Sequence, residues 1–175
     1  MTQLVKYIYW TKIEVPNNTW CLYLAATDEG LCLVTLPSET FDTVKSFAKK
    51  YVPDAILLQD DIKLTPYSQQ IIEYFGGKRK KFNFSLDLKG TPFQRQVWEA
   101  LWEIPFGQTQ SYSAIAKRIG RPTAVRAVGA ANGENPLPIV IPCHRVIGKN
   151  GTLTGYRGGI DIKKDLLQLE GLVGE

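Results

Sequence analysis

Two residues suited to nucleophilic chemistry are neighbours in this 175-residue chain: Cys143 and His144, the latter its only histidine. A thiolate is the nucleophilic form of cysteine, but the ordinary thiol pKa of about 8.5 leaves little of it ionised at neutral pH. His144 can accept the thiol proton directly or through one water molecule, and a carboxylate on its other ring nitrogen would orient the ring. We expect Glu170 to be that carboxylate, because it ends a helix that is buried along one stripe. The sequence therefore predicts an activated thiol.

The backbone must turn at this pair, since adjacent residues of a flat strand point to opposite faces and cannot cooperate. Pro142 biases Ile141 toward an extended conformation, so we predict a strand over PIVI, residues 138–141, that ends in a turn at Cys143. A lone cysteine is commonly an unreactive core residue. Here the approach NPLPIVIP and the glycine-rich segments GKNG and GYRGG favour a loop that carries function.

The sequence of the first half of the chain predicts a small antiparallel sheet with helices. Apolar and polar residues alternate over 4–36, with a predicted hairpin turn at 28–30. Ser38 is the expected N-cap of one helix, and Thr65-Pro66 is the expected start of a second, which a glycine pair ends. The basic run KRKK that follows is typical of a solvated loop and precedes a predicted domain boundary.

The second half predicts helices. Thr91 is the expected N-cap of a core helix, with Pro92 at its first position. The segments SYSAIAKRIG and TAVRAVGAAN predict two short helices joined by a Gly-Arg-Pro turn, the outline of a helix-turn-helix. Such helix pairs are also common in proteins that never bind DNA. A last helix, from residue 161, is expected to bury Ile162, Leu166 and Leu169.

We therefore expect an α+β chain of two domains, residues 1–85 with the sheet and residues 86–175 mostly helical. Its 44% hydrophobic and 22% charged residues are ordinary globular values, which exclude disordered, collagenous and membrane-spanning classes. The start of the chain lacks the basic and apolar regions of a signal peptide, so we expect a cytoplasmic protein. Three cysteines without a CxxC spacing, and one histidine, predict reduced thiols and no bound metal.

Basic charge is concentrated in one segment. Residues 104–160 carry seven basic side chains against one acid, whereas residues 1–90 carry 11 basic and 10 acidic ones. This excess suits a polyanion such as nucleic acid, although a solvated basic face has the same composition. The helix expected over 123–132 has almost no side-chain bulk, so a protein backbone or a DNA groove can approach it closely, with Arg126 as its one long basic side chain.

Several motifs together resemble the O6-alkylguanine-DNA alkyltransferases: PCHRV at 142–146, RAVGAANGENPLPIVIP before it, GYRGG after it, and EG at 170–171. The resemblance covers residues 91–175 well and residues 1–85 in general layout. It implies a ribonuclease H-like N-terminal domain and a C-terminal winged helix-turn-helix domain. It also implies direct repair of double-stranded DNA: without a cofactor, the protein's own thiol takes the alkyl group from O6-alkylguanine, and from O4-alkylthymine, once per molecule.

The resemblance also implies roles for individual residues. Cys143 would be the alkyl acceptor, with His144, linked to it through water, as its base and Glu170 as the orienter of that base. Asn135 would brace the turn, and Tyr112 would assist the departing guanine. The DNA contacts would come from Thr123, Ala124, Arg126, Ala127, Tyr112 and Arg145, and the flipped base would be enclosed by Pro138, Val146, Tyr156, Arg157 and Gly158.

Arg126 would enter the base stack in place of the flipped nucleotide, beside small residues that let the helix approach the minor groove. Two features depart from the family. Some members hold zinc in the N-terminal domain through cysteine and histidine ligands, and this chain lacks those histidines. Residue 157 is arginine where other members have a small residue, which would change how bulky alkyl groups are admitted if its side chain leans over the base.

Three other functions fit parts of the sequence. A non-catalytic binder of alkylated DNA would keep the base-flipping residues without an acceptor, which Cys143 argues against. A winged-helix transcription regulator would bind a specific duplex even after Cys143→Ala. A cysteine hydrolase would turn over a small ester, although the chain has no second histidine to act as general acid. We expect a monomer that can cluster on DNA and has no membrane partner.

Overall fold

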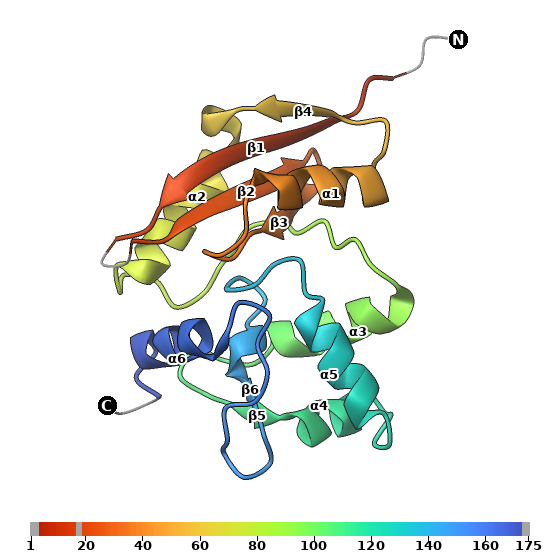
Figure 1. The fold of residues 1–175 in the computed structure, drawn as a ribbon, viewed down its shortest axis with the longest axis vertical. Helices are drawn as coiled ribbons and strands as arrows, with labels where there is room; N and C mark the ends of the chain where they lie inside the picture. Colours follow the sequence, from red (N-terminus) through yellow and green to blue (C-terminus); the bar gives the residue numbers. More distant parts are fainter. Residues whose placement is uncertain (1–3, 17–18, 173–175) are drawn as a thin grey trace. The chain divides into compact units, whose positions relative to one another are not determined.

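The computed structural model describes residues 4–16 and 19–172. The chain divides into two compact units, Met1–Lys89 and Gly90–Glu175. Each has its own secondary structure and its own buried residues (Figure 1). In the described part of the chain, no helix is both long and apolar enough to cross a bilayer.

The first unit contains a four-stranded sheet in the order β3-β2-β1-β4. Strands β1 (Tyr7–Glu14), β2 (Cys21–Thr27) and β3 (Gly30–Val34) pair antiparallel, as the alternating pattern predicts. Strand β4 (Ile56–Gln59) was not predicted, and it pairs parallel to β1. Its four residues are too few for an alternating pattern to distinguish them from a loop.

The predicted hairpin turn between β2 and β3 is present, and Gly30 ends it with a φ of 153°. A Cβ at this position would lie 2.5 Å from the carbonyl oxygen of Ser85. The close approach arises because the amide of Leu31 donates to that carbonyl at 3.0 Å and the amide of Asp87 donates to the carbonyl of Leu31 at 2.9 Å. Glycine is therefore required where the segment after the basic run packs along β3.

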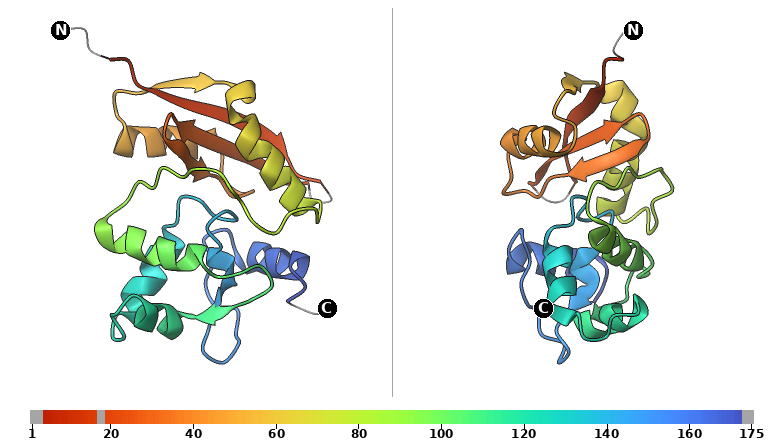
Figure 2. Two further views of the ribbon diagram at one scale, coloured as in Figure 1. Left: turned by 180° about the vertical axis from the view of Figure 1, so that it is seen from behind. Right: turned by 90° about the vertical axis from the view of Figure 1, so that its right-hand side faces the viewer.

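Two helices cover opposite faces of this sheet (Figures 1 and 2). Helix α1 (Phe41–Tyr51) packs on the face that includes Ile8, and helix α2 (Asp61–Phe75) lies on the other. The predicted N-caps are wrong: Thr40, not Ser38, caps α1, and Asp60 caps α2.

The start of α2 was misplaced because Pro66 lies inside the helix, at its second turn. Proline is most common at the first helical position, so Thr65-Pro66 looked like a helix start. The structure begins the helix four residues earlier, where the Asp60 carboxylate accepts a hydrogen bond from the amide of Lys63 at 2.9 Å. The hydroxyl of Thr65 donates to the carbonyl of Asp61, inside the first turn.

The second unit begins with helix α3 (Pro92–Trp102), whose start agrees with the prediction. Thr91 accepts from the amide of Gln94, and Gln94 accepts in return from the amide of Thr91, which makes a capping box. The indole of Trp98 is buried and donates to the carbonyl of Ala131 at 2.8 Å. This bond joins α3 to helix α5 (Val125–Gly133).

The predicted helix pair is present as α4 (Tyr112–Arg118) followed by α5. Gly120, with a φ of 76°, begins the turn that separates them. Two short parallel strands, β5 (Gln110–Ser111) and β6 (Val146–Ile147), connect the start of α4 to the segment after Cys143. The chain is thus α+β, with the sheet in the first unit and most of the helix in the second (Figure 2).

Helix α6 (Ile160–Leu169) buries Leu166 as predicted, but the rest of its buried stripe differs from the prediction. The buried residues are Lys163, Leu166, Leu167 and Glu170, whereas Ile162 and Leu169 are only half-buried. The stripe therefore lies one residue further along the helix, so it carries a lysine at one end and a carboxylate at the other.

Candidate active site

The segment before the thiol is not the predicted strand but a series of tight turns. Ile139 has a φ of 77°, which is uncommon for a β-branched residue and costs about 1–3 kcal/mol. The amide of Ile141 donates to the carbonyl of Leu137 at 2.8 Å, and that of Cys143 donates to the carbonyl of Ile141 at 2.7 Å across Pro142. The second bond, with Pro142 at φ −80° and ψ 65°, is an inverse γ-turn.

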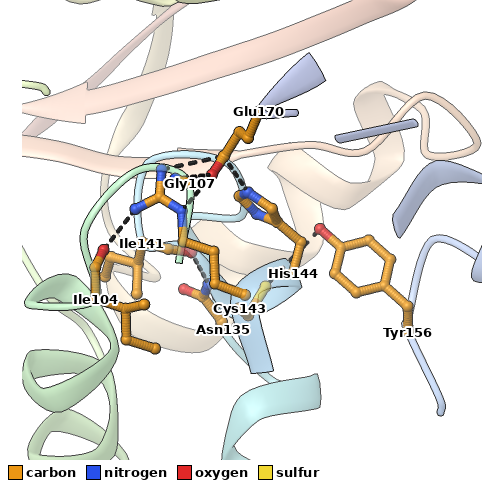
Figure 3. Close-up of polar contacts among 9 residues, drawn as sticks. Ile104, Gly107, Asn135, Ile141, Cys143, His144, Tyr156 and Glu170 are labelled. Atoms are coloured by element: carbon orange, nitrogen blue, oxygen red, sulfur yellow. Dashed lines mark hydrogen bonds and ion pairs between the residues drawn. The ribbon is translucent and has the colours of Figure 1, made fainter. Parts of the chain in front are cut away.

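These turns lead into a single 3-10 turn, Cys143–Arg145, so the backbone does turn at the Cys-His pair as the chemistry requires. Asn135 is 1% exposed and closes the preceding loop with both ends of its amide. Its Nδ2 donates to the carbonyl of Ile141 at 2.9 Å (Figure 3). Its Oδ1 accepts from the amide of Leu137 at 2.9 Å. Asn135 thus holds the strained turn that presents the thiol.

Behind the thiol lies a buried network centred on Glu170. Nε2 of His144 is 2.6 Å from Oε2 of Glu170 (Figure 3). Arg145 donates to both carboxylate oxygens, at 2.8 and 3.0 Å, and to the carbonyl of Ile104 at 2.6 Å. The amide of Gly107 adds a fourth donor, at 3.1 Å. A carboxylate with two guanidinium hydrogen bonds is held ionised, so it accepts the proton of Nε2.

The remaining nitrogen of the His144 ring, Nδ1, then carries the lone pair. It is buried and has no hydrogen-bonding partner among the described side chains and backbone groups. Burial lowers the pKa of His144, and the carboxylate of Glu170 only partly offsets this, so the imidazole is neutral at neutral pH. A neutral ring with a free Nδ1 lone pair can accept a proton.

The structure contradicts the expected contact of Arg145 with DNA. Its side chain is 6% exposed, and its guanidinium is used by Glu170 and Ile104. A buried guanidinium bonded in this way cannot reach a phosphate. The sequence could not show this, since an arginine beside an active-site histidine fits either role.

The thiol of Cys143 is 4% exposed, and its burial raises the pKa above the ordinary value. Polar interactions with Asn135 and Tyr156 act against that rise in the pKa, as do the positive charges of Arg157 and Lys163. Sγ lies 3.8 Å from the hydroxyl oxygen of Tyr156 (Figure 3). The surroundings of the thiol thus contain groups that favour its thiolate form although burial opposes it.

Lys163 is a site residue that sequence reasoning missed. It is fully buried on α6, and its Nζ donates to the carbonyl of Thr154 at 2.9 Å. Nζ also lies 6.0 Å from the ring centre of Tyr112, and burial lowers its pKa while the charge of Cys143 acts to raise it. Its spacing in the sequence could have predicted this burial, because Lys163 precedes the buried Leu166 and Leu167 by three and four residues and so lies on the same face of the helix.

The stability of this unit should depend on pH through His144. Its pKa is lowered on folding, so the unfolded chain binds the proton more readily and stability is lost as the pH falls below the ordinary value of 6.5. Urea unfolding between pH 7.5 and 5 should show the free energy of unfolding falling as the pH falls. His144→Gln should remove the part of this pH dependence that is due to the imidazole. If the free energy of unfolding depended on pH in the same way in the unchanged protein and in His144→Gln, the assignment of a neutral buried imidazole would be contradicted.

The residues expected to contact DNA, apart from Arg145, lie at the helix pair. Thr123, Arg126, Ala127 and Ala130 are exposed at three- and four-residue spacing, while Ala124 at the start of α5 is half-buried. The opposite side of α5 is buried. This helix therefore presents a stripe of small side chains with one arginine.

Tyr112, at the start of α4, is half-buried. Its ring lies 3.9 Å from the point where a Cβ on Gly129 would be. The missing side chain at Gly129 lets Tyr112 lie against α5, and the ring contact with Lys163 brings it toward the thiol. The structure thus places Tyr112 between the helix pair and the active-site elements.

The residues expected to enclose a base differ in exposure. Pro138 and Val146 are buried, Tyr156 and Gly158 are half-buried, and Arg157 is exposed. Of these, Tyr156 is placed against Sγ by a hydrogen bond. Over residues 4–16 and 19–172, no three His, Cys, Asp or Glu side chains are grouped as metal ligands.

Both units match one protein family. Residues 8–88 match the 6-O-methylguanine DNA methyltransferase, ribonuclease-like domain, and residues 92–172 match the 6-O-methylguanine DNA methyltransferase, DNA binding domain. The inducible methylated-DNA--protein-cysteine methyltransferase of Bacillus subtilis is 50% identical over 163 residues, which span 93% of this chain and 90% of that one. The methylated-DNA--protein-cysteine methyltransferase of Methanosarcina acetivorans is 47% identical over 164 residues, which span 94% of this chain and 99% of that one.

Solved structures of proteins from this family have the same fold as this chain. The crystal structure of Mycobacterium tuberculosis O6-methylguanine methyltransferase has a TM-score of 0.79 and 40% identity, and covers 93% of this chain and 92% of that one. The structure of Mycobacterium tuberculosis OGT in complex with DNA has a TM-score of 0.78 at the same identity and coverage. Because both units match and the relatives align over nearly their whole length, the protein belongs to the methylated-DNA–protein-cysteine methyltransferases, the O6-alkylguanine-DNA alkyltransferase family.

Proposed function

We propose that the protein repairs double-stranded DNA by moving the alkyl group of O6-alkylguanine, and of O4-alkylthymine, irreversibly to Sγ of Cys143. The observation that carries this proposal is the buried thiol on a 3-10 turn whose next residue, His144, is kept neutral by burial and oriented by Glu170. The membership of the chain in the methyltransferase family supports the same reaction. No cofactor takes part.

In the proposed reaction, the bond between Sγ and the alkyl carbon forms as the bond between that carbon and O6 breaks. His144 receives the thiol proton at Nδ1 through one water molecule, and the Glu170 carboxylate stabilises the imidazolium that results. Tyr112 donates a proton to the departing guanine and regains one, through water, from the His144 imidazolium, which returns the ring to its neutral form. The net change moves one proton from thiol to guanine, and the thioether is not cleaved again, so each molecule acts once.

The exposed stripe of α5 is the proposed DNA-contacting surface, with Thr123, Ala124 and Ala127 against the minor groove and Arg126 in the base stack. Small side chains allow this close approach, and a base must leave the helix before a buried thiol can reach it. The match of residues 92–172 to a DNA binding domain supports this placement. Tyr156, Arg157 and Gly158, with Pro138 and Val146 behind them, would lie around the flipped base.

Arg126→Ala should slow methyl transfer from a duplex by about tenfold to a hundredfold, since base flipping costs a few kcal/mol that Arg126 would offset. Transfer from free O6-methylguanine, which needs no flipping, should be unchanged. Single-turnover rates with both substrates measure this. Arg95→Ala, at an exposed position on α3, is the matched control for loss of one charge. Equal slowing with duplex and free base would contradict the flipping role.

Counting restored guanine tests the proposed reaction on the DNA side. A duplex with one O6-methylguanine is incubated in excess with protein, and its nucleosides are separated after digestion. Restored guanine should equal the protein present and then stop increasing. Continued turnover would contradict the single use of the thiol.

A second candidate function is a non-catalytic binder of alkylated DNA, which the exposed stripe of α5 alone would support. Tight binding of methylated duplex without any restored guanine would favour it. We further propose that the protein acts as a monomer in the cytoplasm, with alkylated guanine in duplex DNA as its target.

A further inference from the structure

The loop before α6 carries Tyr156 to the thiol, and its neighbour Arg157 is bonded to the far side of the site. Nη1 of Arg157 donates to the carbonyl of Asn135 at 2.8 Å and to that of Gly133 at 3.2 Å. Gly133 is the last residue of α5, where helix carbonyls lack partners within the helix. The arginine therefore joins the Tyr156 loop to the C-terminal end of α5.

The same arginine acts on the residue that braces the thiol turn. Its acceptor is the backbone of Asn135, whose side chain holds Leu137 and Ile141 and acts to lower the pKa of Cys143. Tyr156 lies against Sγ from the loop side. Two groups that flank the sulfur, Asn135 and Tyr156, are thus joined through a single guanidinium.

The loop is also bonded at its ends. The carbonyl of Thr154 accepts from Lys163 and that of Thr152 from Gly148, the carbonyl of Gly159 accepts from the amide of Lys163 at 3.3 Å, and the amide of Gly159 donates back to Tyr156 within the loop. Glycines at 155, 158 and 159 leave the backbone around Tyr156 conformationally free. Arg157 therefore provides two hydrogen bonds between this loop and the segment from the end of α5 to Asn135.

We propose that Arg157 is a positioning residue that determines which alkyl groups Cys143 accepts, by holding the Tyr156 loop at a fixed distance from the Asn135 turn. This rests on the proposed function, because the group arriving at Sγ must fit beside the two residues that flank it. The Arg157 side chain does not extend freely over the base, because its guanidinium is bonded to the carbonyls of Gly133 and Asn135 beside the site. The restraint favours a methyl group and disfavours bulky groups.

The test compares Arg157→Ala and Arg157→Lys with the unchanged protein and with Arg95→Ala. Each is reacted in single turnover with one duplex sequence that contains either O6-methylguanine or O6-benzylguanine. For Arg157→Ala we expect methyl transfer about tenfold slower, because the flanking residues are misplaced, and the ratio of benzyl to methyl rates about tenfold higher. Arg157→Lys should lie between, since an ammonium replaces a planar guanidinium that bonds two carbonyls.

A purely structural or purely electrostatic role gives other results. Methyl and benzyl rates that fall in parallel, with a lower melting temperature, would overturn the proposal, and so would a shifted pH profile with an unchanged ratio. The charge of Arg157 also favours the thiolate, so the pH profiles separate this effect from the change in ratio.

A second readout does not require DNA repair. Cys143 is alkylated with iodoacetamide or with the bulkier monobromobimane, and the modified residue is identified by peptide mapping. Arg157→Ala should raise the rate with monobromobimane relative to iodoacetamide, and an unchanged relative rate would overturn the proposal. If the unchanged protein failed to repair DNA, the proposed function would fail while this readout still decided the role of Arg157.

Discussion

Cys143→Ala should abolish methyl transfer from O6-methylguanine while the protein stays folded and still binds methylated duplex. The reason is that Sγ is the proposed nucleophile and acceptor, so no other group can replace it. The side chain is small, and its removal should lower the free energy of unfolding by about 1 kcal/mol. Transfer is measured as restored guanine, folding by circular dichroism and binding by fluorescence anisotropy.

Cys32→Ala is the matched control. Cys32 is also buried, but burial raises its pKa to about 12, and its thiol donates to the carbonyl of Ala25 at 3.4 Å. It lies on β3 in the first unit, whereas Cys143 and Glu170 belong to the second. We expect this variant to transfer methyl groups at the unchanged rate. Loss of transfer in Cys32→Ala, or its survival in Cys143→Ala, would contradict the assignment of the acceptor.

Arg145→Ala should lower the free energy of unfolding by about 3–5 kcal/mol, as expected when one partner of a buried ion pair is removed. Glu170 would keep its charge in a fully buried position with two of its hydrogen bonds lost. The carbonyl of Ile104 would lose its donor as well. Urea unfolding, monitored by tryptophan fluorescence, measures this loss.

The exposed ion pair of Arg118 with Glu103 provides the comparison. Arg118→Ala should cost at most about 1 kcal/mol, because exposed pairs contribute little. Arg145→Ala should also leave the salt dependence of duplex binding unchanged, since a buried guanidinium releases no counterions from phosphate. A shallower salt dependence with little loss of stability would return Arg145 to the DNA-contacting role predicted from the sequence.

Residue type and spacing were enough to predict much of the fold. The alternation over 4–36 predicted the three antiparallel strands, and Thr91-Pro92 predicted the start of α3, because both signals are local. Strand β4 was missed because its pairing with β1 is non-local, and four residues carry no period. The start of α2 was misplaced because Pro66 was assigned to the position that proline favours most.

At the site, the sequence predicted the pairing of His144 with Glu170, which the structure places at 2.6 Å. It did not predict that Arg145 shares that carboxylate, because charge alone does not distinguish a buried ion pair from a phosphate contact. The turns over 138–141 were predicted to be a strand, since Pro142 favours extended backbone before it and a positive φ at Ile139 has no sequence signal. Such strain is stored where the surrounding bonds, here those of Asn135, hold it.

The central claim is that Cys143 itself receives the alkyl group, and intact-protein mass spectrometry tests it most directly. The protein is incubated with an excess of duplex that contains one O6-methylguanine, then weighed whole and digested for peptide mapping. The account predicts a mass gain of one methyl group per molecule, located on Cys143 and not increasing with longer incubation. An unchanged mass, or a methyl group on any other residue, would contradict it.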